Sequence, residues 1–154
     1  PQAARCFVRL DAVHDLQDTT IMVDEVRLLQ VLTNLVNNAI KSSAEGTAVR
    51  IKISPEGRDG IAFRVIDTGC GIPKHALATV TEPFRQAGSY RTRFSPYSTD
   101  NAGAGLGLAI VKRLTEAHGG TLHIASKVGL GTVVKIHLPK AASLSKSVAA
   151  GGAA

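Results

Sequence analysis

The sequence predicts an α+β domain: a two-layer sandwich in which helices cover one face of a mixed, mostly antiparallel sheet. Two observations support this fold class. First, the predicted strands come in pairs, at residues 48–54 with 61–67 and 121–126 with 132–139, whereas a doubly wound nucleotide fold needs strands that alternate with helices. Second, the length of 154 residues suits one domain, and 44% of them are hydrophobic, which is enough for a core without disulfides or metal.

Composition narrows the function classes. The net charge is +6, but the 18 Lys and Arg residues are spread along the chain and aromatic residues make up only 4%, so we expect no nucleic-acid partner. Cys6 and Cys70 form no C-x-x-C pair, and no apolar run approaches the roughly 18 residues that span a bilayer. We therefore expect a cytoplasmic domain without direct membrane contact, although a longer parent protein can be membrane-anchored.

The first half of the chain predicts a strand and a long helix. Residues 4–10 alternate loosely and predict a strand, and the polar segment 14–20 predicts a connection. A helix follows Asp24, a good N-cap, and stops before Gly46. Its apolar residues have the i, i+3, i+4, i+7 spacing of an amphipathic helix and are Leu28, Val31, Leu32, Leu35, Val36, Ala39 and Ile40.

The second half predicts two hairpins, two helices and a long loop. The turn sequence PEGRDG joins strands 48–54 and 61–67, and KVGLG joins the final two strands. Helical spacing marks a short helix near 74–79 and a longer one at 105–118. Between them, residues 83–105 show no period, which is typical of a functional lid or of disorder. We expect residues 1–140 to form the domain and residues 141–154 to be a flexible tail.

A polar edge runs along the long helix. With Asn34 at zero and about 100° per residue, Asn38 falls near 40° and Lys41 near −20°, beside the apolar stripe. Such an edge also occurs as the solvated face of any amphipathic helix. Amide oxygens are hard ligands suited to Mg²⁺, however, and a Lys one turn further on is placed to meet phosphates.

A carboxylate with two glycines follows the strand at 61–67. Asp67 can accept hydrogen bonds from an exocyclic amine, and Gly69 and Gly71 let a flat ring or a phosphate approach the backbone. A plain β-turn explains the tripeptide DTG equally well.

Glycines also open the helix at 105–118. Gly103, Gly105 and Gly107 precede or begin it, and consecutive backbone N–H groups at a helix N-terminus attract phosphate. The spacing differs from the dinucleotide fingerprint G-x-G-x-x-G. The alternative is that these glycines serve only the turn into the helix.

Taken in order, NLVNNAIK, DTGCGIP, TEPF and GAGLGLAIVKRLTEAHGG resemble the N, G1, F and G2 boxes of the catalytic ATP-binding domain of sensor histidine kinases. That domain belongs to a superfamily shared with gyrase and the heat-shock chaperone ATPases. The resemblance covers roughly residues 4–139. It implies a Bergerat-type sandwich backed by three helices, with ATP between the first helix and a long lid.

The resemblance also implies residue roles. Asn38 would be the Mg²⁺ ligand, with Asn34 on the same edge and Lys41 on phosphate, and Asp67 would take the adenine amine. The other residues that it places around ATP are Gly69, Gly71, Ile72, Phe84, Gly103, Gly105, Leu106 and Gly107. Residues 85–102 would form the lid, from which Arg85, Arg91 or Arg93 would reach the γ-phosphate.

Four positions depart from the family pattern. Ser42 replaces an aromatic after the N-box Lys, and Thr81 replaces the aromatic that opens the F box. Gln86 stands where the family often has a basic residue, and Ala104 where it often has Thr or Ser. No metal ligand or adenine acceptor is lost, so we expect weakened rather than abolished ATP binding.

The chain lacks a recognisable phosphoacceptor. His14-Asp15-Leu16 begins like the phosphoacceptor motif, but Gln17-Asp18 ends the match in a segment expected to be extended. The resemblance therefore implies a protein-histidine kinase domain that donates the γ-phosphoryl group to a His on a separate dimerisation hairpin, in cis or in trans, with a response regulator downstream.

Three alternatives remain. The first is a degenerate nucleotide-binding module without phosphotransfer, which the departures favour. The second is an autonomous ATP hydrolase, disfavoured because relatives of that kind have a Glu at the position of Asn34, where an amide cannot accept a proton. The third is nucleic-acid binding, which only the net charge suggests.

Overall fold

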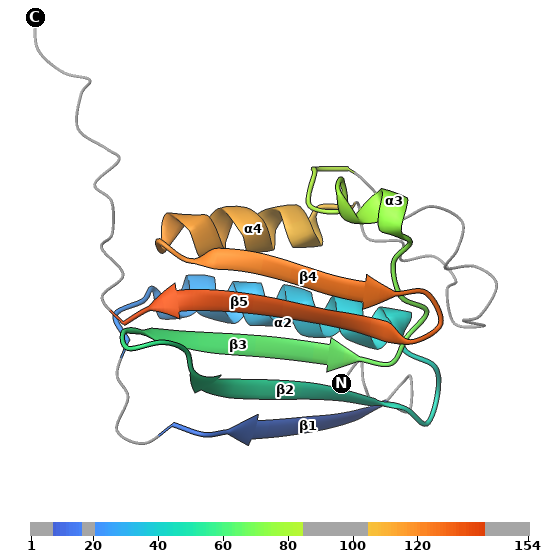
Figure 1. Ribbon diagram of the computed structural model, residues 1–154, viewed down its shortest axis with the longest axis horizontal. Coiled ribbons are helices and arrows are strands. Elements are labelled where there is room, and N and C mark those ends of the chain that lie inside the picture. Colours follow the sequence, from blue (N-terminus) through green and yellow to red (C-terminus); the bar gives the residue numbers. More distant parts are fainter. Residues whose placement is uncertain (1–7, 17–20, 85–104, 141–154) are drawn as a thin grey trace, which may run out of the picture.

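The computed structural model describes residues 8–16, 21–84 and 105–140. A five-stranded sheet in the order β1-β2-β3-β5-β4 forms one layer (Figure 1). The strands are β1 (Arg9–His14), β2 (Ala48–Pro55), β3 (Gly60–Asp67), β4 (Thr121–Lys127) and β5 (Gly131–Pro139). Only the β1–β2 pairing is parallel, and the other three are antiparallel. The predicted mixed sheet and both predicted hairpins are therefore confirmed.

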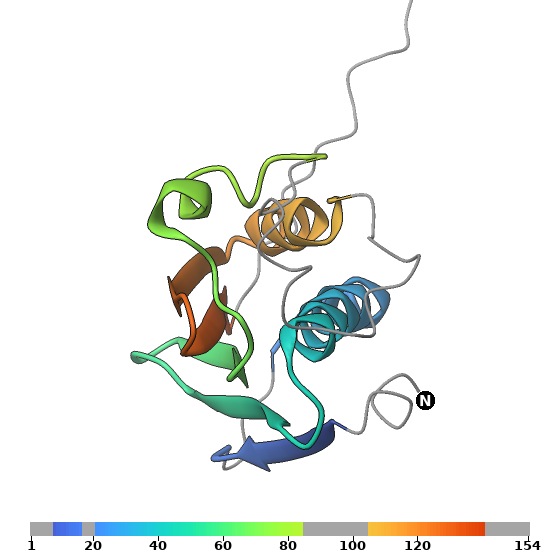
Figure 2. The ribbon, with the colours of Figure 1, turned by 90° about the vertical axis from the view of Figure 1, so that its right-hand side faces the viewer.

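The helices form the second layer. Helices α2 (Glu25–Ser42) and α4 (Gly107–Ala117) lie side by side on one face of the sheet, and the short helix α3 (Lys74–Leu77) lies against the edge strand β4 (Figure 2). Buried aliphatic side chains fill the space between the layers and include Val31, Leu35, Val49, Val65, Val111 and Ile136. Among the described residues, no helix is long and apolar enough to cross a membrane.

Side chains fix both ends of α2. Asp24 is the predicted N-cap, and its Oδ1 accepts a hydrogen bond of 3.0 Å from the Arg27 N–H. At the other end Ser43 turns extended, and the hydroxyls of Ser42 and Ser43 both donate to the Ala39 carbonyl, at 2.9 and 2.8 Å. The helix therefore ends four residues before Gly46, where the two hydroxyls bind the Ala39 carbonyl and the Ser43 N–H also reaches the Ile40 carbonyl.

The first strand differs from its prediction. Residues 4–7 of the predicted strand lie outside the described residues, and β1 runs on to His14. Its parallel register pairs Arg9 with Ala48 and His14 with Ile53. This pairing joins segments about forty residues apart in sequence, so local alternation alone could not place the boundary. His14, exposed at the strand end, is extended as predicted.

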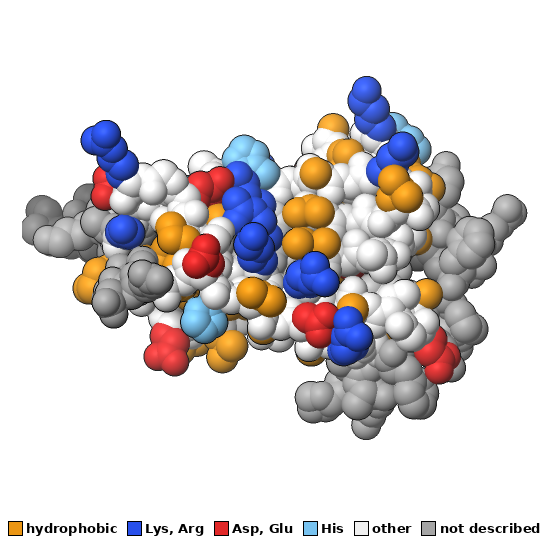
Figure 3. Space-filling view, turned by 60° about the horizontal axis from the view of Figure 1, so that its bottom comes forward, with side chains coloured by type: hydrophobic (Ala, Val, Ile, Leu, Met, Phe, Trp, Pro, Cys, Tyr) orange, Lys and Arg blue, Asp and Glu red, His pale blue; other side chains and the backbone are white. Residues whose placement is uncertain are grey.

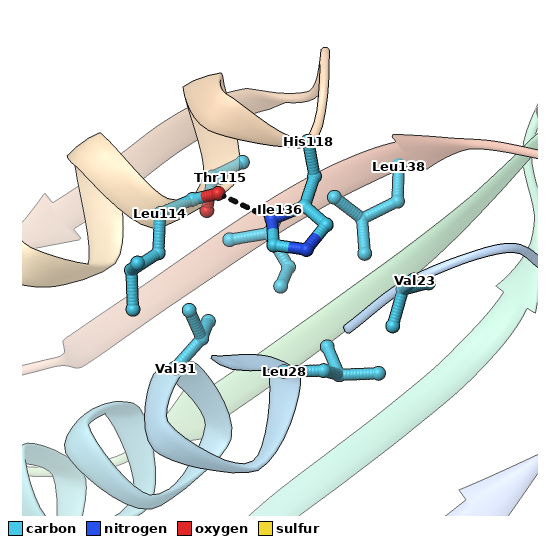
Figure 4. A pocket seen from close by; sticks show the side chains of 8 residues that line it. All are labelled: Val23, Leu28, Val31, Leu114, Thr115, His118, Ile136 and Leu138. Atoms are coloured by element: carbon cyan, nitrogen blue, oxygen red, sulfur yellow. Dashed lines mark hydrogen bonds between the residues drawn. The ribbon is translucent and has the colours of Figure 1, made fainter. Parts of the chain in front are cut away.

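One end of the α2–α4 pair is closed. Here the N-terminal part of α2 meets the C-terminal end of α4 over a void of about 10 Å³. Figure 4 shows Leu28 and Val31 of α2 pointing toward it, with Leu114 and His118 from α4. The His118 Nδ1 lies 2.7 Å from the Leu114 carbonyl, and its Nε2 accepts from the Asp24 N–H at 3.3 Å. One imidazole thus ties the end of α4 to the N-cap of α2.

Candidate functional site

At the opposite end of the helix pair, α2 and α4 border a groove of about 320 Å³. The groove combines the polar edge of α2 with the start of α4. Its lining residues are Asn34, Asn37, Asn38, Lys41, Val80, Gly105, Leu106, Gly107, Leu108 and Ile110. The structure therefore brings together, across one cleft, two sequence motifs that are more than sixty residues apart.

The amides of α2 present oxygen atoms at this groove. The Asn34 Nδ2 donates to the Gln30 carbonyl at 2.9 Å, which fixes the orientation of that amide and leaves its Oδ1 without a hydrogen-bond partner among the residues that the structure describes. A Cβ placed on Gly107 would lie 3.1 Å from the Asn38 Nδ2, 3.4 Å from the Asn34 Oδ1 and 3.5 Å from the Asn38 Oδ1. Both oxygens therefore border the beginning of α4. Hard oxygen donors facing a polar cleft suit Mg²⁺, which binds few protein groups together with phosphate oxygens.

The beginning of α4 offers backbone donors. Gly105 has φ +70°, a backbone conformation that residues other than glycine rarely adopt, and α4 starts two residues later. Among the described residues, no side chain caps the helix at Leu106. The first N–H groups of a helix have no intrahelical acceptor and carry the positive end of its dipole. Residues Gly105 to Gly107 can therefore hold an anion beside the α2 amides.

Lys41 adds a positive charge to the same cleft. It lies in the last turn of α2 and is half-buried. Within residues 8–16, 21–84 and 105–140 it takes part in no ion pair, unlike Lys135, which binds Glu56 at 2.8 Å. An unpaired ammonium beside amide oxygens and helix N–H groups favours a ligand that carries several negative charges.

Asp67 ends β3 beneath the C-terminal end of α2. It is only 6% exposed, and its Oδ1 accepts a hydrogen bond of 2.9 Å from the Gly69 N–H. Burial raises the pKa of Asp67, and hydrogen bonding from the Gly69 and Thr132 backbone opposes that rise. The carboxyl is thus held in place but keeps acceptor capacity, as a buried group that receives an amine must.

The two glycines after Asp67 have a packing reason of their own. A Cβ on Gly69 would overlap the Ser42 carbonyl, and a Cβ on Gly71, where φ is +71°, would overlap the Lys127 carbonyl. Ile72 follows, and its N–H donates to the Ser126 hydroxyl at 2.7 Å. These contacts join the loop after β3 to α2 and β4, so the glycines are required for the fold whatever they contribute to a base pocket.

Some predicted site residues are not brought together. Asp67 is not among the residues that line the groove, although the Gly69–Ser42 contact places it next to the end of the helix that carries Asn38 and Lys41. Phe84 is 75% exposed, with φ 62°. Arg85, Arg91, Arg93 and Gly103 lie outside the described residues, so their placement stays a prediction.

The structure adds three residues to the predicted set. Asn37 lines the groove, and the same helical wheel would have placed it near −60°, next to Lys41. Thr132 pairs with Asp67 in the β3–β5 register, and its backbone lowers the pKa of Asp67. A Cβ on Gly131, with φ +117°, would overlap the Asp67 carbonyl. The sequence identified the stretch before Thr132 only as a turn, because pairing of β5 with β3 is a long-range contact.

A family model matches most of the chain. Residues 23–142, well over half of the chain, match the family described as histidine kinase-, DNA gyrase B-, and HSP90-like ATPase. The chain belongs to this ATPase family. The relatives described next are a sensor kinase/phosphatase and two histidine kinases.

Three curated relatives illustrate the similarity. The autoinducer 2 sensor kinase/phosphatase LuxQ of Vibrio cholerae is 41% identical over 119 residues, which is 75% of this chain and 13% of LuxQ. The circadian input-output histidine kinase CikA of Synechocystis is 38% identical over 134 residues, 86% of this chain and 17% of CikA. The cell-division control histidine kinase PdhS of Brucella ovis is 36% identical over 143 residues, 90% of this chain and 14% of PdhS. The ATPase-family domain thus spans less than a fifth of each relative.

Solved structures agree. Full-length ShkA in complex with AMPPNP superposes with a TM-score of 0.75 at 32% identity, over 93% of this chain and 28% of ShkA. The nucleotide-free catalytic domain of histidine kinase ThkA superposes with a TM-score of 0.73 at 26% identity, over 91% of this chain and 84% of that domain. The predicted histidine-kinase ATPase fold is confirmed.

Proposed function

We propose that this domain binds ATP with Mg²⁺ and donates the γ-phosphoryl group to a histidine on a separate helical hairpin, in two-component signal transduction. The observation that carries the proposal is the groove in which the amides and lysine of α2 face the glycine-rich start of α4. Membership of the ATPase family and the ShkA complex with AMPPNP support a nucleotide as the ligand.

The triphosphate would lie in the groove. In this arrangement Asn38 holds Mg²⁺ through its amide oxygen, with Asn34 beside it, and Lys41 meets a phosphate. The N–H groups of Gly105 to Gly107 hold further phosphate oxygens. The base reaches past the end of α2, where Asp67 accepts the exocyclic amine and Gly69, Gly71 and Ile72 border the ring.

Phosphoryl transfer needs positioning and charge neutralisation more than covalent help from the protein. An unprotonated imidazole nitrogen of the partner hairpin forms the new P–N bond while the bond from the γ-phosphorus to the β–γ bridging oxygen breaks. ADP leaves with the electron pair of that bond, and the second ring nitrogen releases its proton. When bound, Mg²⁺ neutralises charge on the phosphates. Because Asn34 is an amide and cannot activate water as a base, we expect slow ATP hydrolysis by the isolated domain.

Calorimetric titration tests nucleotide binding. The full chain is titrated with a non-hydrolysable ATP analogue, with and without Mg²⁺. Wild type should give a binding heat, and its affinity should be higher with Mg²⁺. The affinity of Asp67→Asn should be at least tenfold lower, because an amide NH₂ would face the base amine. The matched control is Asp59→Asn, an exposed change in the β2–β3 turn, which should bind as wild type does. Equal affinity of all three proteins would contradict the assigned base site.

A second candidate is a nucleotide-binding module without transfer. Ser42 favours it, because this hydroxyl lies against Asp67 where an aromatic would border the base. Incubation of the chain with labelled ATP and a histidine-bearing hairpin domain from a relative separates the two. Label on the hairpin that is absent with Asn38→Ala supports the kinase, whereas nucleotide binding without labelled hairpin supports the module.

The wider assignment follows from the same proposal. Relatives that contain this domain are multidomain sensor kinases, so the phosphoaccepting and dimerising hairpin lies in cis in a longer parent or comes from a partner, and a response regulator receives the phosphoryl group. ATP as the donor implies that the domain works in the cytoplasm.

A further inference from the structure

The face of the sheet turned away from the helices carries a row of basic side chains. Strand register places Lys52 of β2 opposite Arg64 of β3, Arg64 opposite Lys135 of β5, and Lys135 opposite His123 of β4. We call these four residues the basic row. Their neighbours along each strand, such as Phe63 and Val134, point the other way into the core. Figure 3 shows Lys and Arg side chains gathered in a band across the strands of this face.

Nearby carboxylates neutralise only part of this charge. Glu56 binds Lys135 at 2.8 Å and Arg64 at 3.5 Å, and these cations hold the pKa of Glu56 below its usual range. Asp11 on β1 is bound by Arg9 at 3.0 Å. Lys52 and its neighbour Arg50 are exposed and, in the described part of the chain, belong to no ion pair. Glu56 thus offsets Arg64 and Lys135, but Lys52 lies directly opposite Arg64. Like charges directly opposite in a sheet are destabilising, so fold stability does not account for Lys52.

A second row beside the first is apolar. Register places Ile66 opposite Val133, and Val133 opposite Ala125. These three residues, which we call the apolar row, are half-buried or exposed on the same face. A basic stripe next to an apolar stripe is the complement of an amphipathic acidic surface.

The chemistry favours a protein over the other anionic occupants. Sheets that bind single-stranded nucleic acid stack bases on aromatic side chains, and the described strands present none outward, since Phe63 is 5% exposed and faces the core. Residues 1–7 and 141–154 do not match either, because they contain Arg5 and Lys146 but no Asp or Glu. The occupant is therefore a different, acidic protein segment.

The spacing points to a helix. Neighbouring strands lie about 4.8 Å apart, and one turn of an α-helix rises about 5.4 Å. A helix lying across the strands therefore meets about one strand per turn. Carboxylates at i, i+4 and i+7 would face three successive positions of the basic row, with small apolar side chains at the flank over the apolar row.

We propose that this open sheet face is a docking site for an acidic amphipathic helix of a partner protein, with carboxylates against the basic row and apolar side chains against the apolar row. The site lies on the side of the sheet opposite the nucleotide groove, so it leaves ATP binding unobstructed.

The test uses the full chain and a defined probe. The probe is a synthetic 18-residue helical peptide with one Glu per turn on one face and Leu and Ala beside it, titrated at about 0.15 M salt, where nonspecific surface attraction is largely screened. Its control carries Gln in place of every Glu. NMR shift changes on binding should map to the outward residues of β2, β3, β4 and β5.

Matched variants locate the site. Arg50→Gln/Lys52→Gln removes two exposed charges from the face, and Lys112→Gln/Arg113→Gln removes two exposed charges from α4. We expect the first to weaken peptide affinity about fivefold or more and the second to change it less than about twofold. Both variants should bind the ATP analogue as wild type does, which separates failure of this proposal from failure of the proposed function.

Three results would overturn the proposal: no peptide binding, equal weakening by the two double variants, or equal binding of the Gln peptide. Tighter binding of a 20-base-pair DNA or of phosphatidylserine vesicles to the same residues would replace the protein partner with a nucleic acid or a membrane.

Discussion

The two ends of the α2–α4 pair differ in what they enclose. At one end the helices close over about 10 Å³ between mostly aliphatic side chains, and at the other they border about 320 Å³ whose lining includes amides, a lysine and glycine backbone. The same two helices form both ends, so the difference comes from the side chains. Apolar residues at the helical period close one end, whereas polar residues on α2 and glycines at the start of α4 leave the other open.

The two ends should therefore respond differently to mutation. The closed end should govern stability with little effect on nucleotide binding, and the open end should govern nucleotide binding. Residues that pack against the end of α2 beside the groove, such as Gly69, should affect both stability and nucleotide binding. The following predictions test this division, from the largest expected effect to the smallest.

The largest effect is expected at Ile136, which is fully buried and lines the closed end. Ile136→Ala should lower the free energy of unfolding by about 4 kcal/mol, because it removes three carbons from a packed site, and Ile136→Val by about 1 kcal/mol. Urea unfolding followed by circular dichroism measures both. Under conditions in which the valine variant is folded, its affinity for the ATP analogue should match wild type; a parallel loss of affinity would show that the ends are not independent.

Gly69 tests the support of the open end. Gly69→Ala should destabilise by about 3 kcal/mol, because its Cβ would overlap the Ser42 carbonyl at the end of α2. The matched control is Gly57→Ala, where φ is +69° but nothing lies within 4 Å of the new Cβ, so only the conformational cost of about 1 kcal/mol is expected. Thermal unfolding compares the two. Equal losses would mean that the close approach to Ser42 does not constrain the loop.

Thr115 sharpens the account of the closed end. Its hydroxyl is buried without a hydrogen-bond partner among the described residues, and the side chain lines the small void. Thr115→Val keeps the shape and removes the orphan hydroxyl, so it should stabilise the domain by about 1 kcal/mol. Differential scanning calorimetry measures the shift in Tm. A lower Tm than wild type would contradict the apolar character of this end.

The smallest effect concerns pH and Asp67. Burial raises the pKa of Asp67 in the folded state, so its contribution to stability is fully present below its unfolded pKa of 3.8 and is lost as pH rises through the folded value. Asp67→Asn stays neutral and avoids that loss. The stability of the variant relative to wild type should therefore increase as pH rises from below 3.8 through the raised pKa. Urea unfolding at several pH values tests the sign, and a relative stability that falls with rising pH would refute it.

Sequence reasoning succeeded where the signal was local. The wheel position of Asn34, Asn38 and Lys41 depends only on helix geometry, and the structure places all three along one groove. Both hairpins were predicted because alternation and turn residues are contiguous in sequence. Asp24 was predicted as the N-cap because a cap acts on residues next to it in sequence; its side chain binds the N–H of Arg27, three positions on.

It failed where distant segments meet. The end of β1 depends on a parallel pairing with β2. Gly69 is needed because the Ser42 carbonyl at the end of α2 lies against it, and Gly131 because the Asp67 carbonyl lies against it. The basic row is likewise invisible in sequence, because its four members come from four strands and become neighbours only through register. The assignments at Arg85, Arg91, Arg93 and Gly103 stay predictions.

The most direct test of the account is a crystal of the full chain grown with a non-hydrolysable ATP analogue and Mg²⁺. The account predicts phosphates between Asn38, Lys41 and the N-terminus of α4, the metal at the Asn38 amide oxygen, and the base amine on Asp67. The account would be contradicted if the ligand bound elsewhere and the groove were empty, or if the base pointed away from Asp67.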